Sequence, residues 1–452
     1  MLGSGVALWK NWDPWPQKYV WKPRDSNARF SRAAFSPDSS TLTVREFSYS
    51  ATTNSNFYVM DLQSGTQTGV YEGLPSTGIH GPTFSPDGRL VLIAYDDVCK
   101  ARIWNTRDAS LRCELTGSPD RIWTVQFSPD GSRVLTNNPL NTLQDWDTRT
   151  GALLHEYPDP KSMHEACYSP DGTRILHRLE DSKFEVLDAA TFRSIFICSH
   201  HQRYIPMVKY SFDGKRILTT SKDLTSCVFD ADDGRLLATL PREQEYTQSC
   251  AFSPDGRWIT TSSFDDLTIY DANTYKLAFT HRAHFRTHIA NTHFTRDGKW
   301  LMIRGFDGNQ HKGTVEDYVK VYRLGNWTEQ YFLSLGHPVD FAEYAPDESR
   351  IYVGSDHAVS VFDARTFDLL HTVKFETKQR YPRLQLSPDC QWLLTFSTEG
   401  ESLTLWHNRR PEWWWGIAWL PAFWAGVVFL ALLIWSIRSD RRTFRQKKKP
   451  VL

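Results

Sequence analysis

The stretch "AFSPDGRWITTSSFDDLTIYD", residues 251–271, contains the pattern that decides the fold. Phe252 ends a short apolar run, and residues 253–256 are the Ser-Pro-Asp-Gly of a type I turn. Residues 258–262 and 267–271 are rich in the β-branched and aromatic residues of strands. With the apolar runs on either side, we expect four short antiparallel strands in about 42 residues, which form a sheet too thin to bury both of its faces.

The same turn recurs along the whole chain at intervals of 41 to 50 residues. Repeats of about 40 to 45 residues with four strands each are the signature of propeller blades. Blades packed around a ring cover both faces of every sheet. The nine turn aspartates are Asp38, Asp87, Asp130, Asp171, Asp213, Asp255, Asp297, Asp347 and Asp389.

These turns, together with third-strand endings such as "DWD" at 145–147 and "LWH" at 405–407, resemble the WD40-repeat family over residues 27–408. The resemblance implies an all-β β-propeller of four-stranded blades, with nine blade motifs and seven to nine blades. The family's tryptophan stands only at Trp104, Trp146 and Trp406, and its Gly-His pair is clear only at residues 336–337. We therefore expect its hydrogen-bonded tetrad to be missing from most blades.

A propeller ring is usually closed by a strand from one end of the chain that completes the blade at the other end. The ninth motif lacks a fourth strand of its own. We expect the N-terminal segment, residues 1–26, to supply it, and residues 5–12 ("GVALWKNW") are the candidate strand.

Residues 409–437 predict a transmembrane helix with a Trp-rich flank. From residue 413 to residue 437 there are 25 residues without a charge, which is enough to span a bilayer core of about 30 Å at 1.5 Å per residue. Tryptophans stand near both ends of this run, as in interfacial aromatic belts. The alternative, a buried core helix, rarely lacks a polar stripe over this length. The sequence thus predicts a propeller anchored to a membrane by a single C-terminal helix.

The net charge of zero hides a split between the tail and the rest. Residues 438–452 hold seven basic residues and one acid, so the rest of the chain carries −6. Such a propeller is a poor candidate for nucleic-acid binding, which needs a basic surface. The basic tail is expected to contact anionic lipid.

Sequence arguments disagree on which side of the membrane the propeller faces. The basic tail favours a cytosolic tail and an external propeller. The N-terminus, however, lacks the features of a signal peptide, and the seven scattered cysteines, without a CxxC pair, favour a reducing compartment. We expect a single-pass membrane protein whose propeller lies on the cytosolic side.

No catalytic motif is present: the chain lacks GxSxG, HExxH, P-loop and GxGxxG patterns. Four histidines at 281, 284, 288 and 293 are spaced by 3, 4 and 5 residues, which suits no single strand face. We therefore expect loop and edge histidines rather than a metal site. The sequence predicts no catalytic residue, metal or cofactor.

One position in the repeat is biased towards residues that anchor protein interfaces. It lies six residues before the aromatic or aliphatic residue that opens each turn, at the start of the innermost strand. Arg and Tyr are enriched in binding hot spots, so we predict a partner-binding rim on one face of the ring. Packing of amphipathic side chains at strand entries is the alternative explanation. The predicted rim residues are Arg29, Arg121, Tyr204, Tyr246, His288 and Arg380.

Two repeats are longer than the others, and the extra residues, "SYSATTNSN" and "GFDGNQHKGTVED", fall between the second and third strands. We expect loops there, on the same face as the predicted rim. The favoured function is a non-catalytic protein–protein interaction scaffold, tethered to a membrane, whose protein partner is unidentified. The alternatives are an extracytoplasmic sensor or ligand-binding propeller, similar to the periplasmic TolB-like proteins, and an accessory propeller of a hydrolase system.

Overall fold

The described part of the computed structural model contains nine four-stranded antiparallel sheets, and every turn motif in the sequence joins the first two strands of one blade. We number the blades 1 to 9 in chain order. The structure describes these residues: 17–23, 28–48, 55–74, 81–95, 100–118, 122, 124–138, 142–158, 166–179, 182–240, 249–263, 266–282, 288–309, 314–334, 339–355, 358–374, 384–396 and 402–407.

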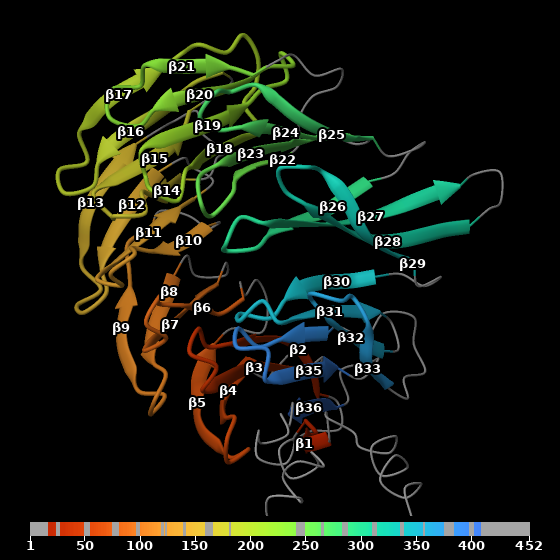
Figure 1. The fold of residues 1–452 in the computed structure, drawn as a ribbon. Helices are drawn as coiled ribbons and strands as arrows, with labels where there is room; N and C mark the ends of the chain where they lie inside the picture. Colours follow the sequence, from red (N-terminus) through yellow and green to blue (C-terminus); the bar gives the residue numbers. More distant parts are fainter. Residues whose placement is uncertain are drawn as a thin grey trace, which may run out of the picture. The chain divides into compact units, whose positions relative to one another are not determined.

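Each of blades 1 to 8 is a meander in which strands pair with their neighbours in the sequence (Figure 1). Blades 1 to 4 consist of β2 (Ala28–Phe35), β3 (Thr41–Ser48), β4 (Ser55–Asp61) and β5 (Gln67–Leu74); β6 (Thr83–Phe84), β7 (Leu90–Tyr95), β8 (Lys100–Asn105) and β9 (Leu111–Leu115); β10 (Thr124–Phe127), β11 (Arg133–Asn137), β12 (Thr142–Asp147) and β13 (Leu153–Pro158); β14 (Ala166–Tyr168), β15 (Arg174–Arg178), β16 (Phe184–Asp188) and β17 (Ser194–Cys198).

Blades 5 to 8 follow the same order. They consist of β18 (Met207–Tyr210), β19 (Arg216–Thr220), β20 (Ser226–Asp230) and β21 (Leu236–Thr239); β22 (Ser249–Phe252), β23 (Trp258–Ser262), β24 (Asp266–Asp271) and β25 (Leu277–Arg282); β26 (His288–Phe294), β27 (Trp300–Asn309), β28 (Thr314–Arg323) and β29 (Thr328–Ser334); β30 (Val339–Tyr344), β31 (Arg350–Ser355), β32 (Ala358–Asp363) and β33 (Leu369–Lys374).

Blade 9 combines both ends of the propeller. Its first three strands are β34 (Leu384–Leu386), β35 (Trp392–Phe396) and β36 (Leu403–His407), and its fourth is β1 (Gln17–Trp21), which pairs with β36. The closing strand is therefore Gln17–Trp21 and not residues 5–12, which lie outside the described residues. A buried cluster that includes Leu42 of blade 1 and Leu394 of blade 9 packs the two blades together, so the ring is closed.

The core lies between blades rather than inside any one of them. Each buried cluster joins two successive blades; for example, Val186 of blade 4 packs with Ile217 and Phe229 of blade 5. A sheet of one layer cannot exclude water by itself, and each blade is stabilised by burying its faces against its neighbours.

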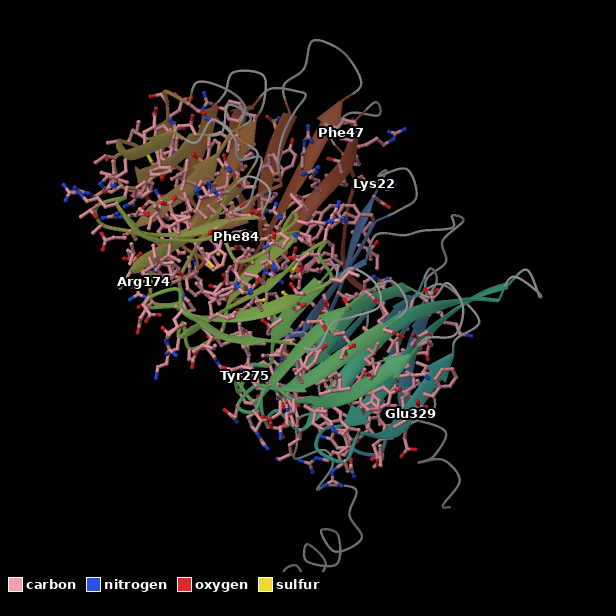
Figure 2. The ribbon with its side chains drawn as sticks, turned by 90° about the horizontal axis from the view of Figure 1, so that it is seen from above. Lys22, Phe47, Phe84, Arg174, Tyr275 and Glu329 are labelled. Carbon is pink, nitrogen blue, oxygen red and sulfur yellow. The ribbon has the colours of Figure 1, made fainter. Side chains whose placement is uncertain are left out.

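Arginine side chains add a polar link between successive blades. Arg133 Nη1 donates to the carbonyl of Ala189 in the next blade at 2.8 Å, and Arg216 Nη1 donates to Ala272 at 2.6 Å. Arg174, labelled in Figure 2, makes the equivalent bond to Ala231. Each of these arginines opens the second strand of its blade, so one sequence position links blades 3 to 4, 4 to 5 and 5 to 6.

The described parts of the two insertions are strand where loops were expected, and residues 49–54 and 310–313 lie outside the described residues. In blade 7, β27 and β28 stay paired out to Asn309 and Thr314, and in blade 1, β3 continues to Ser48. The prediction of loops was wrong over these residues, because extra backbone pairs satisfy the hydrogen bonds of a polar, glycine-containing segment as well as a loop does.

Among the described residues, no helix is long and apolar enough to cross a membrane. The predicted span, residues 409–437, and the basic tail, residues 438–452, lie outside the described residues.

Candidate interaction site

The predicted rim can be located in part. In each blade, the second strand ends, the third strand begins and the fourth strand ends on one face of the ring, which we call the rim face. The connections that contain the Ser-Pro-Asp turns lie on the other, the turn face. Tyr204 has a described side chain on the rim face, in the segment that leads into blade 5.

Arg29 and His288 lie in the first strands of blades 1 and 7. Arg29 pairs with Phe47 of β3, labelled in Figure 2, and His288 pairs with Phe306 of β27. Arg121, Tyr246 and Arg380 lie outside the described residues. The structure therefore leaves the proposed six-residue rim untested as a set, and it describes the surroundings of Tyr204 in most detail.

The segment containing Tyr204 begins at a buried histidine. His201 is 3% exposed; its Nδ1 lies 3.1 Å from Asp223 Oδ2, and its Nε2 lies 2.7 Å from Thr219 Oγ1. A carboxylate only accepts hydrogen bonds, so the proton of the neutral ring is assigned to Nδ1. His201, Asp223 and Thr219 correspond to three members of the tetrad expected to be missing from most blades, while Phe229, in the place of its tryptophan near the end of the third strand, offers no hydrogen-bond donor. Sequence analysis missed them because His200, and not glycine, precedes His201.

Asp223 holds the start of the segment in place. Its Oδ2 also accepts the backbone amide of Gln202 at 2.9 Å. Burial would raise the pKa of Asp223, but hydrogen bonds from Thr225 and from the Gln202 amide outweigh burial and lower it to about 2. The carboxylate is therefore ionised at neutral pH, and its acceptor sites are used within blade 5.

The next four carbonyls are each held by a donor. Ser221 Oγ donates to Arg203 O at 3.0 Å, and the amide of Lys222 donates to Tyr204 O at 2.9 Å. Arg178 of blade 4 donates through Nη1 to the carbonyls of Ile205 and Pro206, at 2.8 and 2.6 Å. Ile205 is fully buried between blades 4 and 5. The segment is thus fixed along its backbone by two blades.

The side chains of this segment form a surface with aromatic and cationic character. The Tyr204 ring has Arg178 Cζ and Lys222 Nζ each 5.2 Å from its centroid. Gln202, Arg203 and Lys222 are exposed. We call Gln202, Arg203, Tyr204 and Lys222 the blade 5 surface. The backbone of the turn beside it has an unusual conformation, since Leu224 has φ of 70°, which is rare for a residue other than glycine.

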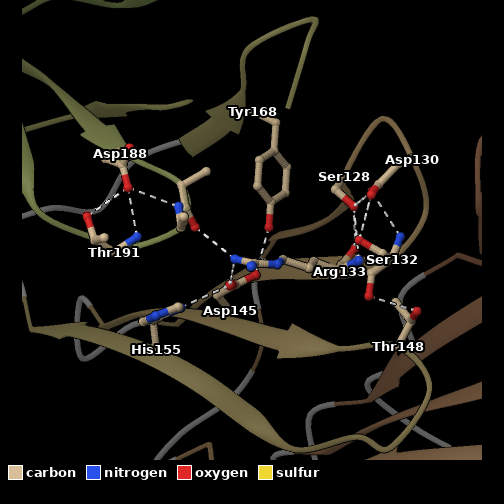
Figure 3. A network of polar contacts seen from close by, with 12 residues as sticks. Ser128, Asp130, Ser132, Arg133, Asp145, Thr148, His155, Tyr168, Asp188 and Thr191 are labelled. Carbon is tan, nitrogen blue, oxygen red and sulfur yellow. Dashed lines mark hydrogen bonds and ion pairs between the residues drawn. The ribbon is translucent and has the colours of Figure 1, made fainter. Parts of the chain in front are cut away.

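A second polar cluster, shown in Figure 3, serves the structure of the ring. The Asp145 side chain is fully buried and is contacted by Arg133 at 3.0 Å, by His155 Nδ1 at 3.3 Å and by the Tyr168 hydroxyl at 2.7 Å. Burial raises the pKa of Asp145, and these three contacts oppose the rise. Because Tyr168 comes from blade 4 and Asp145, Arg133 and His155 come from blade 3, we assign these contacts to inter-blade cohesion.

The histidines at 281, 284, 288 and 293 do not form one cluster in the described part of the chain. His281 is in β25 of blade 6 and contacts Tyr318 and Tyr322, whereas His293 is in β26 of blade 7. His284 lies outside the described residues. No group of three or more His, Cys, Asp or Glu able to hold a metal ion occurs among the residues that the structure describes.

Comparison with known proteins agrees with this architecture. A family model described as "WD domain, G-beta repeat" matches residues 234–270, which include most of blade 6. The chain is 32% identical over 95 residues to eukaryotic translation initiation factor 3 subunit I of Pyricularia oryzae, and 29% identical over 138 residues to protein groucho of Drosophila melanogaster. It is 30% identical over 81 residues to small ribosomal subunit protein RACK1y of Oryza sativa. These alignments cover 21%, 30% and 18% of this chain, and 27%, 19% and 24% of those proteins, respectively.

The fold is similar to the C-terminal WD40 domain of Sif2, with a TM-score of 0.54 and 13% sequence identity, over 88% of this chain and 99% of that domain. At this identity the likeness concerns the fold alone. The nine-bladed ring and this likeness show a β-propeller fold, and residues 234–270 are similar to a WD40 repeat.

Proposed function

We propose that this protein is an interaction scaffold whose propeller binds a protein partner through the blade 5 surface. The observation that carries the proposal is the fixed segment from His201 to Pro206, in which successive backbone groups are hydrogen-bonded to blades 4 and 5. A surface that is ordered before binding loses little conformational entropy when a partner docks.

The residue types of the blade 5 surface favour an anionic partner. Tyrosine and arginine are the types most enriched in hot spots. Arg203 and Lys222 are exposed cations, while Asp223 beside them has its acceptors occupied within the blade. The surface would therefore attract carboxylates or phosphates of a partner. Two of the similar proteins are, by their names, a subunit of a translation factor and a protein of a ribosomal subunit, which agrees with a role in assemblies.

We further propose that residues 409–437 tether the propeller to a membrane and that residues 438–452 contact anionic lipid. The uncharged run and its tryptophan flanks support the tether. The side of the membrane is proposed to be cytosolic. Its support is that no disulfide joins any of the six described cysteines, as is usual in proteins of reducing compartments.

A capture experiment from detergent-solubilised membranes tests the scaffold. We would compare the full chain with a variant carrying Arg203→Ala, Tyr204→Ala and Lys222→Ala, and with a control carrying Lys215→Ala and Arg235→Ala on the turn face. The variant of the blade 5 surface should lose at least one co-purifying protein that the wild type and the control both retain. Identical sets of captured proteins from all three would overturn the proposal for this surface. Reaction of the wild type's thiols with an impermeant maleimide on intact cells would overturn the cytosolic side.

A further inference from the structure

An open cavity of about 620 Å³ lies on the turn face and is lined by the inner strands and turns of blades 5 to 9 and by Phe35 of blade 1. It is separate from the blade 5 surface, which lies on the rim face. Its volume falls within the range of roughly 300 to 1,000 Å³ that is usual for ligand sites.

The repeat itself shows that this cavity is lined by unusual residues. All nine turns close with the same hydrogen bond, from the amide of the fourth residue to the carbonyl of the first. The second residue is proline in seven turns, and the two exceptions, Phe212 and Arg296, both line the cavity. The fourth residue is glycine in six turns, and two of the three exceptions, Glu348 and Cys390, line it as well.

These exceptions are not required by the turns. Glu348 has φ of 55°, in the left-handed region where glycine is favoured, so its backbone is strained relative to the glycine of the other turns. Phe212 is 63% exposed and is the only exposed large hydrophobic residue of the described chain that does not lie on an outermost strand. Departures from a repeat that converge on one cavity indicate a role other than folding.

The charge in the cavity is dominated by Glu343, on the inner strand of blade 8. Among the described residues Glu343 makes no hydrogen bond or ion pair. Its side chain is exposed to the open cavity, and partial desolvation by the surrounding chain raises the pKa of its carboxyl group. Glu348 accepts a hydrogen bond from the backbone amide of Arg296, and the side chains of these two lining residues carry one negative and one positive charge. Burial lowers the pKa of His293, with Glu348 opposing the shift, so the imidazole is neutral at pH 7. One carboxylate is left without a counter-charge.

Apolar groups surround this carboxylate. Phe35, Phe212 and Leu386 line the cavity together with three prolines of the turns. A ligand that satisfies both features has a cation at the end of an apolar stem. Lysine and arginine side chains have this form, because a chain of methylene groups separates the charge from the backbone.

We propose that this cavity binds a basic side chain, Lys or Arg, in a peptide segment of a protein partner. The ammonium or guanidinium group pairs with the Glu343 carboxylate, and the methylene stem packs on Phe212 and Leu386. The site gives the ring a second binding surface with the opposite charge preference from the blade 5 surface.

The proposal is tested with the full chain in detergent micelles and fluorescein-labelled peptides of sequence Gly-Ala-X-Ala-Gly, where X is Lys, Arg, norleucine or Glu. Fluorescence anisotropy should show the Lys and Arg peptides binding about tenfold tighter than the norleucine peptide, as expected for one charged hydrogen bond. The Glu peptide should bind most weakly. Absence of binding by all four peptides, or equal binding of Lys and norleucine, would overturn the proposal.

Two variants and a control locate the site. Glu343→Gln should remove the preference for Lys over norleucine. Phe212→Pro restores the residue found in seven other turns, so the variant should fold normally. It should weaken the binding of both the Lys and the norleucine peptide by several-fold. Glu156→Gln, on the outermost strand of blade 3, should change nothing. Retention of the Lys preference by Glu343→Gln, with an unchanged melting temperature, would place binding elsewhere. Displacement of the Lys peptide by n-butylammonium at the peptide's own affinity would show that free amines, not peptides, are the ligands.

Discussion

The hydroxyl of Tyr168 donates to the carboxylate of Asp145 at 2.7 Å across the boundary between blades 3 and 4. Both groups are buried, and the pKa of Tyr168 is raised by burial and then by the Asp145 charge. Tyr210 occupies the equivalent position of blade 5, but its buried hydroxyl has no hydrogen-bond partner among the described residues. The two tyrosines therefore form a matched pair within one molecule.

The first prediction uses this pair. Tyr168→Phe should destabilise the protein by about 1 to 3 kcal/mol, because it leaves a buried carboxylate with one donor fewer. Tyr210→Phe should be neutral or slightly stabilising, since it removes a buried hydroxyl that gains nothing. Urea unfolding followed by tryptophan fluorescence measures both. Equal effects of the two substitutions would contradict the role assigned to the Asp145 contact.

The second prediction concerns the arginine links between blades. Arg216→Met keeps the apolar stem but leaves the buried carbonyl of Ala272 without its donor, so we expect a loss of about 1 to 3 kcal/mol. Arg235→Met is the control: the Arg235 side chain is 65% exposed and, among the described residues, forms ion pairs with Asp230 and Asp233, so its effect should stay within about 0.5 kcal/mol. Thermal melts measure both variants. A lower melting temperature for Arg235→Met than for Arg216→Met would exclude the Arg216 link as a source of stability.

The sequence was sufficient for the nine blade motifs, because most of the turns have the residue types that their geometry demands, but it left the number of blades between seven and nine. The sequence was insufficient where contacts between distant segments determine which strand pairs or which polar groups meet. Residues 5–12 and Gln17–Trp21 both contain strand-forming residues, and pairing with β36 selects the second. The partial tetrad around His201 was hidden because its members come from three separate segments of blade 5 and lack the glycine that usually marks them.

The predicted rim illustrates the same limit. The place of Tyr204 in the repeat singled it out together with five other residues. That place indicates only where the innermost strand of a blade begins. The contacts that distinguish Tyr204, with Arg178 of the preceding blade and with Lys222, depend on the packing of neighbouring sheets. The cavity residues Phe212, Arg296 and Glu348 were visible in the sequence as departures from the repeat, but their convergence on one space was not.

The third prediction is a pH dependence that arises from His201. Burial lowers the pKa of His201 despite the nearby Asp223 charge, so below the ordinary value of 6.5 the unfolded chain binds a proton that the folded chain does not. By linkage, stability rises with pH up to about 6.5 and falls on acidification below it. The Asp223 contribution, with a pKa lowered from 3.8 to about 2, is lost only at lower pH, as pH falls below about 4.

Urea unfolding at about pH 7.5 and pH 5.5 separates these two groups, since Asp223 stays ionised at both values. The wild type should lose more stability between the two values than His201→Gln does. The same loss in both proteins would assign the pH dependence to other groups.

The fourth prediction is that the residue proposed to bind a cation lowers the stability of the empty protein. The pKa of Glu343 is raised by partial desolvation, so the folded chain holds its proton more tightly than the unfolded chain, and stability falls as pH rises above about 4.5. Glu343→Gln should therefore raise the melting temperature at pH 7 by about 1 °C, a small effect because the side chain faces solvent in the cavity. At about pH 4, where the carboxyl group is protonated, the difference should vanish. Differential scanning fluorimetry at both pH values measures it, with Glu156→Gln as control. A variant that melts below the wild type at pH 7 would mean that Glu343 already has a stabilising partner, and the cavity would then lack the unpaired charge on which cation binding depends.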